Sequence, residues 1–253
     1  NDERDIYRRI YENLLKNNLD NENIVYEYLH EKICGWNDGG EVLLQYIQRI
    51  NFADLPKEFT QIIEWFGTFD LSTNEIRENL VYAISILYAS LYGELVFEHP
   101  LKNNDIYAMA TASGILDCKE GMSLYDFSCG SGGVLALSAS VDCEIYAQER
   151  DFEKAVVAYM YLKLSKASSV HIEVGDVLES PMTRSYPTLQ FDRIICAPPM
   201  KQKYKMEDRY NDMYEQEFQY EYSLMESGFW SYARHIIRKL KNEGKAVLIA
   251  PVS

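Results

Sequence analysis

The sequence predicts an α/β protein, with a parallel β-sheet flanked by helices and an all-α domain in front of it. Apolar residues recur every three to four positions over residues 1–92, which is typical of helices. From about residue 105 onward, short apolar runs alternate with helical stretches, and this alternation favours parallel strands joined by right-handed crossovers. The chain has 253 residues, of which 47% are hydrophobic, so it can bury a substantial core.

The N-terminal region is expected to form a helical domain over residues 1–92, followed by a second domain over residues 93–253. Thr60 to Trp65 is a short third element, and Ser72 to Glu75 then offers N-cap chemistry before the helical stretch that starts at Ile76. The apolar residues with helical spacing are Ile6, Ile10, Leu14 and Leu15, then Leu43, Leu44, Ile47 and Ile50, then Ile76, Leu80, Ile84 and Leu87.

The second domain contains five expected strands. They are Met122–Phe127, Glu144–Ala147, Val170–Val174, Phe191–Cys196 and Lys245–Ala250. Helices are expected from the glycine-rich turn through Ser138, over Phe152–Leu164 and over Leu224–Leu240. In parallel sheets of this kind, ligands bind at the carboxyl ends of the strands. The loops that follow these strands are therefore where chemistry is expected.

Composition excludes several classes of protein. No run of about 20 apolar residues is present, which argues against a membrane span, and no signal peptide is visible. Five cysteines without a C-x-x-C pair do not suggest a disulfide framework, so we expect reduced thiols and a cytoplasmic location. The four histidines show no metal-ligand spacing, so no metal site is expected.

The charge is strongly acidic and uneven. The formal charge is −14, made up of −10 over residues 1–110, −5 over residues 111–200 and +1 over residues 201–253. Such a chain is not expected to hold DNA phosphates by itself, because that requires clustered basic residues. The best local candidates are Lys201, Lys203, Lys205 and Arg209, and a solvated loop is the alternative reading.

A glycine-rich turn follows the first expected strand. Residues 126–133 read Asp-Phe-Ser-Cys-Gly-Ser-Gly-Gly. Glycines at a strand-to-helix turn let the backbone approach a ligand closely, and the helix N-terminus behind them favours anionic groups. Asp126 can accept hydrogen bonds from a ligand ammonium or hydroxyl group. The segment is neither G-x-G-x-x-G nor a P-loop.

Three further loops make this signal specific. Glu149 ends the second strand, where an acidic side chain can bind the two ribose hydroxyls of a nucleoside. Asp176 follows the third strand, where a short carboxylate can accept from the exocyclic amine of adenine. Pro198 and Pro199 fix a rigid turn after the fourth strand. Each has a plain alternative, such as a surface charge or a helix cap, but their order along the chain favours a nucleotide-type site.

This set of motifs resembles the class I S-adenosylmethionine-dependent methyltransferases, which have a Rossmann-like sheet. Among them it is most similar to the amino-group DNA methyltransferases, and in particular to the modification subunit of type I restriction systems. Residues 126–133 match that family's Asp-Pro-x-Cys-Gly-Ser-Gly-Gly motif except at Phe127. Ala147-Gln148-Glu149 is close to its Gly-Gln-Glu motif, and Gly175-Asp176 matches its third motif. Gly93-Glu94 and Pro100 weakly match an upstream stretch.

The resemblance implies S-adenosylmethionine as the cofactor and N6 of adenine in DNA as the methyl acceptor. It implies that Gly130, Ser131 and Gly132 line the amino-acid portion of the cofactor, above Asp126. It further implies that Glu149 binds ribose, that Asp176 binds the adenine amine, and that His99 and Pro100 lie near the methionine carboxylate. Ser128, Cys129 and Val177 complete the implied cofactor-binding set.

One departure bears on activity. The family's catalytic motif is Asn, Asp or Ser, then Pro-Pro, then an aromatic residue, whereas this chain has Ala197, Pro198, Pro199 and Met200. In the family, the polar side chain and a proline carbonyl accept the amine protons of a flipped base, and the aromatic ring stacks on that base. Ala197 has no acceptor, and Met200 cannot stack as a ring does.

Three explanations of this departure stay open. The chain is a degenerate methyltransferase that keeps its cofactor site, or it is active through a different acceptor with Tyr204 or Tyr210 as the platform, or Ala197 is an introduced substitution. The alternative function is accordingly a non-catalytic scaffold that binds the cofactor, a partner subunit or both.

The resemblance also implies partners for the chain. In the family, a further helix and an antiparallel strand pair follow the fifth strand, so we expect the domain to be incomplete at Ser253. DNA would be recognised as a duplex through a separate specificity subunit, and a restriction subunit is a further partner.

Overall fold

The computed structural model describes ten segments of the chain. These are residues 40–49, 76, 79–80, 83, 118–138, 143–164, 169–178, 181–182, 188–198 and 228–249. The expected boundary between residues 92 and 93 lies outside these segments, as do the helical stretches at residues 6–15 and 84–87. The division into two domains therefore remains a prediction.

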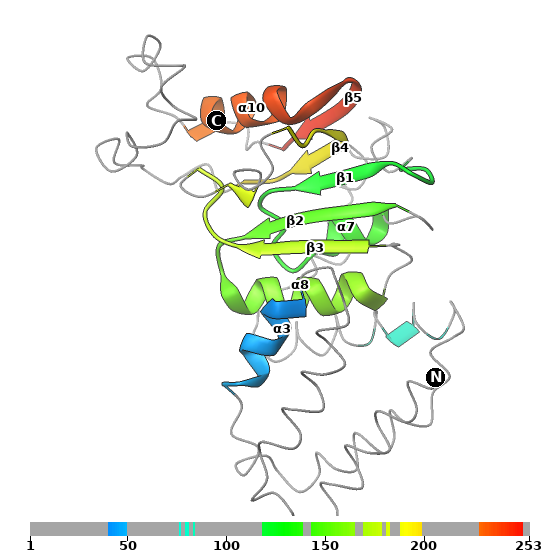
Figure 1. The fold of residues 1–253 in the computed structure, drawn as a ribbon, viewed down its shortest axis with the longest axis vertical. Coiled ribbons are helices and arrows are strands. Elements are labelled where there is room, and N and C mark those ends of the chain that lie inside the picture. Colours follow the sequence, from blue (N-terminus) through cyan, green and yellow to red (C-terminus); the bar gives the residue numbers. More distant parts are fainter. Residues whose placement is uncertain are drawn as a thin grey trace, which may run out of the picture.

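A five-stranded parallel sheet forms the centre of the described fold. Its strands are β1 (Ser123–Asp126), β2 (Glu144–Glu149), β3 (Ser169–Val174), β4 (Phe191–Cys196) and β5 (Leu240–Leu248). Their spatial order is β3-β2-β1-β4-β5, and every neighbouring pair is parallel. The chain therefore reverses its direction of winding between β1 and β4, which Figure 1 shows at the middle of the sheet. Ligands of open α/β sheets bind at such a switch point, outside the carboxyl ends of the strands.

Helices cover both faces of this sheet. α7 (Gly133–Ser138) and α8 (Phe152–Leu164) follow β1 and β2, and α3 (Gly40–Ile47) packs against α8. α10 (Gly228–Lys239) lies on the opposite face, beside β4 and β5 (Figure 1). Alternation along the strands separates the two cores. Leu124 and Ile195 face α8, whereas Tyr125 and Ile194 face α10.

Most expected elements are confirmed with small changes at their ends. β4 and α8 have the bounds that the sequence predicts, while β1 is shorter by one residue at each end and β2 continues to Glu149. α3 begins at Gly40, just before the apolar residues at positions 43, 44 and 47 whose spacing predicts a helix. Ile76 and Leu80 are both helical, in agreement with the apolar spacing there.

The start of β5 differs from the prediction. The strand begins at Leu240, directly after α10, rather than at Lys245. Leu240 pairs with Phe191, and Lys245 pairs with Arg193, so the polar residues between them form an irregularity within the strand. Their side chains are mostly exposed, which explains why the sequence there reads as a turn.

Within the described segments, no helix combines the length and the apolar composition that crossing a membrane requires.

Candidate functional site

The glycine-rich turn connects β1 to α7 at the carboxyl edge of the sheet. Gly130 has φ of 56° and Gly132 has φ of 81°, so both adopt the left-handed conformation that favours glycine. Gly132 N donates to Cys129 O at 2.9 Å, and Gly132 O accepts from Ala136 N at 2.9 Å, which starts α7. The turn is thus a fixed structure rather than a loose loop.

The two glycines meet different surroundings. A Cβ atom on Gly132 would lie 3.1 Å from Ala158 Cβ and 3.2 Å from Ala158 Cα, because the turn packs closely against α8. A Cβ atom on Gly130 would meet no atom within 4 Å. Gly132 therefore permits close packing, and Gly130 leaves one side of the turn open.

Glu149 joins the turn to the end of β2. Its Oε2 accepts a hydrogen bond from Gly130 N at 2.9 Å, and its Oε1 accepts one from Asp151 N at 2.9 Å. The neighbouring Gln148 is fully buried, its carbonyl accepts from Cys129 N at 3.1 Å, and its Oε1 accepts from Met182 N at 3.0 Å. Sequence reasoning assigned no role to Gln148, although it lies in the motif beside Glu149. A polar residue next to a strand-end acid is the signal that could have revealed it.

Asp126 lies at the end of β1 beneath this turn. Its side chain is buried, and its Oδ1 accepts from Ser128 N at 2.9 Å. Burial raises the pKa of Asp126 to about 7, and the nearby Glu149 carboxylate acts in the same direction, while the Ser128 N–H opposes it. The site therefore holds a carboxyl group that changes charge near neutral pH.

Asp176 occupies the turn after β3. Its Oδ1 accepts from Leu178 N at 2.9 Å, and Gly175 N donates to Glu149 O at 2.9 Å. Val177, the next residue, is buried. The third loop is therefore attached to the second through a backbone hydrogen bond.

The turn after β4 completes the edge. Ala197 is exposed and Pro198 is buried, and Cys196 O accepts from Ile249 N at 2.9 Å. Pro199, Met200, His99 and Pro100 lie outside the described residues, and so do Tyr204 and Tyr210. Of the expected site residues, the structure thus brings together the glycine-rich turn, Asp126 and Glu149, with Asp176 beside them.

Two cysteines near this edge are not activated thiols. Burial raises the pKa of Cys129 and of Cys196 well above the usual value, and the Asp126 carboxylate adds to both shifts. A thiol with a raised pKa is a poor nucleophile. Both residues are buried, so we assign neither of them a nucleophilic role.

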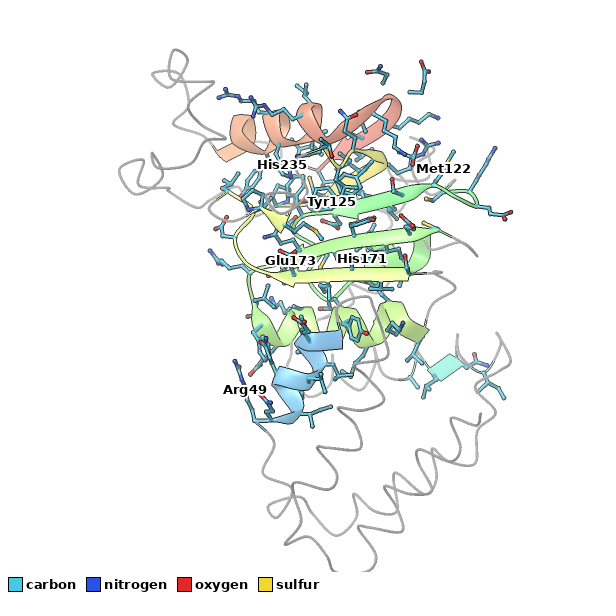
Figure 2. The ribbon with its side chains drawn as sticks, viewed as in Figure 1. Arg49, Met122, Tyr125, His171, Glu173 and His235 are labelled. Atoms are coloured by element: carbon cyan, nitrogen blue, oxygen red, sulfur yellow. The ribbon has the colours of Figure 1, made fainter. Side chains whose placement is uncertain are left out.

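Phe127 replaces the proline of the related motif and has a structural explanation. Its ring stacks on Tyr232 of α10 at a centroid distance of 5.8 Å and meets His235 edge-on at 5.0 Å. Tyr125, on the same face, donates to or accepts from His235 Nε2 at 3.1 Å, and Figure 2 shows these two residues facing each other. Phe127 therefore anchors the glycine-rich turn to α10.

Known structures share this fold at low sequence identity. The methyltransferase subunit of a type I restriction-modification system from Streptococcus thermophilus aligns with a TM-score of 0.65 and 15% identity, covering 96% of this chain and 54% of that one. A modification subunit assigned to a type I restriction enzyme of Vibrio vulnificus aligns with a TM-score of 0.56 and 15% identity, covering 84% of this chain and 47% of that one. The chain thus spans about half the length of these two proteins.

A third structure, described as a class I S-adenosylmethionine-dependent methyltransferase from Listeria monocytogenes, aligns with a TM-score of 0.55 and 16% identity, covering 98% of this chain and 74% of that one. No curated protein sequence matches the chain significantly. At these identities the structural likeness establishes the class I methyltransferase fold alone.

The family follows from a sequence match. The model of the N-6 DNA methylase family matches residues 107–252, which is more than half of the chain and includes every described strand. The matched region also contains the glycine-rich turn, Asp126, Glu149 and Asp176. The chain belongs to the N-6 DNA methylase family.

Proposed function

We propose that this chain is the cofactor-binding and catalytic part of a DNA methyltransferase that transfers a methyl group from S-adenosylmethionine to N6 of adenine, as in type I restriction-modification. The observation that carries the proposal is the meeting of the glycine-rich turn, Asp126 and Glu149 at the carboxyl edge of the sheet. Family membership supports the reaction, and the shared fold supports the place of the site.

The residues present fit S-adenosylmethionine. Gly130 leaves open space on one side of the turn, where a side chain would otherwise stand. The backbone of the turn can therefore approach a ligand closely. When bound, S-adenosylmethionine supplies a methyl group activated by its sulfonium centre.

Each carboxylate has a distinct role in the proposed site. Asp126 would lie beneath the amino-acid portion of the cofactor, Glu149 would bind the ribose hydroxyls, and Asp176 would bind the adenine amine. Glu149 can do this without releasing the turn, because an ionised carboxylate has about four acceptor positions and the two backbone N–H groups use only two of them. His99 and Pro100 would complete the site near the methionine carboxylate.

The turn at Ala197 to Met200 would receive the flipped adenine. A backbone carbonyl in this turn can accept one amine proton, but Ala197 has no second acceptor for the other. By comparison with the loss of a single transition-state donor elsewhere, this gap could lower the rate roughly 10²–10³-fold. We therefore expect slow methylation from the chain as it stands.

Ala197 also favours a second candidate function. In that case the chain is a scaffold that binds the cofactor or a partner subunit without transferring the methyl group. Under either function, we propose that the chain acts in the cytoplasm, meets duplex DNA through a separate specificity subunit, and assembles with a restriction subunit. The acidic net charge of −14 supports a separate DNA-binding partner.

Calorimetric titration with S-adenosylmethionine tests the cofactor site. We expect binding by the unaltered chain and at least a tenfold weaker Kd, about 1.4 kcal/mol, for Glu149→Gln. Glu144→Gln is the matched control, since Glu144 lies exposed at the other end of the same strand. If the folded, unaltered chain does not bind S-adenosylmethionine, both the methyltransferase and the cofactor-binding scaffold are rejected.

Transfer of labelled methyl groups to adenine-containing DNA separates the two candidates. We expect Ala197→Asn to raise the rate by at least tenfold, because Asn restores the missing acceptor. The same substitution outside the turn, Ala233→Asn on α10, would not supply an acceptor there. The scaffold function would be favoured if the unaltered chain and Ala197→Asn both bind the cofactor fully and neither of them methylates DNA.

A further inference from the structure

Two thiols meet at the edge of the sheet opposite the candidate functional site. Cys118 precedes β1 and Cys143 directly precedes β2, and their Sγ atoms lie 3.0 Å apart. The two residues are 25 positions apart in sequence, and their side chains are 3% and 0% exposed. Met122, labelled in Figure 2 at the amino end of β1, marks this edge. The Sγ separation is only about 1 Å longer than a disulfide bond.

Backbone hydrogen bonds on both sides fix this meeting. Met122 N donates to Lys119 O at 3.0 Å, which closes a turn and places Cys118 beside the sheet. Met122 O accepts from Glu144 N at 3.0 Å, and Ser123 pairs with Glu144 in the parallel ladder. The two cysteines therefore face each other because the strands that follow them are in register.

The electrostatic surroundings favour a thiolate on Cys118. The hydrogen bond with Cys143 lowers the pKa of Cys118, and the Arg193 guanidinium lowers it further, while burial and Asp192 oppose these effects. Arg193 donates from one terminal nitrogen to Asp192 O at 2.8 Å, and its buried Nε has no partner among the described residues. A cationic side chain with a vacant donor is a suitable neighbour for an anion.

Neither the candidate site nor a metal accounts for this pair. The glycine-rich turn lies at the carboxyl end of β1, and the thiols lie at its amino end. No group of three or more metal-ligating side chains occurs among the described residues, so the pair is not part of a recognisable metal cluster there.

We propose that Cys118 and Cys143 form a reversible dithiol–disulfide site that responds to peroxides. Disulfides in cytoplasmic proteins are usually transient and redox-sensing, so this site is compatible with thiols that are normally reduced. The oxidised form would enclose β1, the glycine-rich turn and α7 in one covalent loop.

The chemistry balances with hydrogen peroxide as the oxidant. The Cys118 thiolate attacks the O–O bond, forms a sulfenic acid and releases hydroxide, which takes up a proton to become water. The Cys143 thiol then attacks the sulfenic sulfur, and the S–S bond forms as a second water leaves. Two thiols lose two electrons in total, and one peroxide is reduced to two waters. Residues 119–121 beside Cys118 are exposed, so opening of this turn admits the oxidant.

Peptide mapping of the purified full chain after peroxide treatment tests the proposal. Under non-reducing conditions we expect a crosslinked peptide pair that contains Cys118 and Cys143, has lost two hydrogens and disappears with dithiothreitol. Cys118→Ser and Cys143→Ser should each abolish this species, whereas Cys34→Ser should leave it unchanged. The oxidised chain should also melt several degrees higher than the reduced chain, because the crosslink restricts the unfolded state.

Two results would contradict the proposal of a Cys118–Cys143 dithiol–disulfide site. One is conversion of Cys118 to a sulfinic acid with no crosslink in the unaltered, folded chain. The other is a disulfide that joins Cys34, Cys129 or Cys196 in place of the Cys118–Cys143 pair. Both readouts use the unaltered chain, so they remain informative if a serine variant does not fold.

Discussion

Gly130 and Gly132 show, at the residue scale, how one turn combines an open side with a packed side. Both are left-handed, but a methyl group on Gly130 would project into open space, whereas one on Gly132 would press against the backbone of Ala158. The open side is where a ligand can approach, and the packed side holds α7 and α8 together. The two positions should therefore respond differently to the same substitution.

We expect Gly132→Ala to destabilise the fold by roughly 2–5 kcal/mol, through left-handed strain and overlap with Ala158. Gly130→Ala should cost only about 1 kcal/mol, since strain alone acts there. For cofactor binding, in contrast, Gly130→Ala should be clearly harmful, because its methyl group would occupy the open side. Urea denaturation measures the first effect and titration with S-adenosylmethionine the second. Equal losses of stability in the two variants would contradict the packing argument.

Residue chemistry at the strand ends could be predicted from sequence. Asp126, Glu149 and Asp176 each follow an apolar run, and parallel sheets place such residues at one edge. Pairings between distant segments could not be predicted in the same way. Neither the hydrogen bond from Gly130 N to Glu149 nor the approach of Cys118 to Cys143 leaves a local pattern, because each depends on strand register.

At the element scale, the sequence predicts the bounds of strands and helices that are themselves mostly apolar. β4 and α8 are of this kind, and their predicted bounds are confirmed. β5 is predicted to start too late, because the residues directly after Leu240 are polar and exposed, and Leu240 is the only residue of this first part that pairs with β4 in the strand register, through Phe191. A local pattern cannot reveal a strand that begins directly at the end of a helix and then bulges.

Asp192 connects three strands at the amino edge of the sheet. Its Oδ2 accepts from Ser123 N at 2.9 Å and from Ser123 Oγ at 3.0 Å on β1, and it pairs with Lys241 Nζ on β5 at 2.7 Å. Burial acts to raise the pKa of Asp192, but the hydrogen bonds from Lys241 and Ser123 outweigh it and lower the pKa. Strands β1, β4 and β5 therefore share one carboxylate.

Asp192→Ala should lower the free energy of unfolding by about 1–3 kcal/mol, because the Ser123 donors lose their partner. Lys241→Ala removes only a pair whose lysine side chain is 45% exposed, so its effect should stay below about 1 kcal/mol. Added salt should weaken the second effect and leave most of the first. Chemical denaturation at two salt concentrations measures both, and a larger loss for Lys241→Ala would show that the ion pair dominates.

At the scale of the whole molecule, two buried titratable groups have opposite effects on how stability depends on pH. Asp126 has its pKa raised from 3.8 to about 7, chiefly by burial. His235 has its pKa lowered from 6.5 to about 3, chiefly by burial and further by Lys239 and Arg238. Both groups are therefore neutral in the folded protein at mildly acid pH, when their counterparts in the unfolded chain are charged.

The signs of the two effects follow from proton linkage. Between about pH 4 and pH 7, Asp126 is ionised in the unfolded chain but protonated in the folded protein. A rise in pH therefore favours the unfolded chain, and the contribution of Asp126 to stability falls. Between about pH 3 and pH 6.5, His235 is protonated in the unfolded chain and neutral in the folded protein. A rise in pH therefore disfavours the unfolded chain, and the contribution of His235 to stability grows. Each slope approaches about 1.4 kcal/mol per pH unit, and over the shared window the two cancel.

Single substitutions should reveal the pH dependence that each group contributes to the free energy of unfolding. Relative to the unaltered chain, Asp126→Asn should gain stability steadily as pH rises from about 4 to 7, by at most about 4 kcal/mol. His235→Gln should start with a fixed loss, because the hydrogen bond with Tyr125 is weakened, and should lose further stability as pH rises from about 3 to 6.5. Urea denaturation across this range measures both differences. If the free energy of unfolding depends on pH in the same way in all three proteins, neither group is buried in its neutral form, and the argument from proton linkage fails.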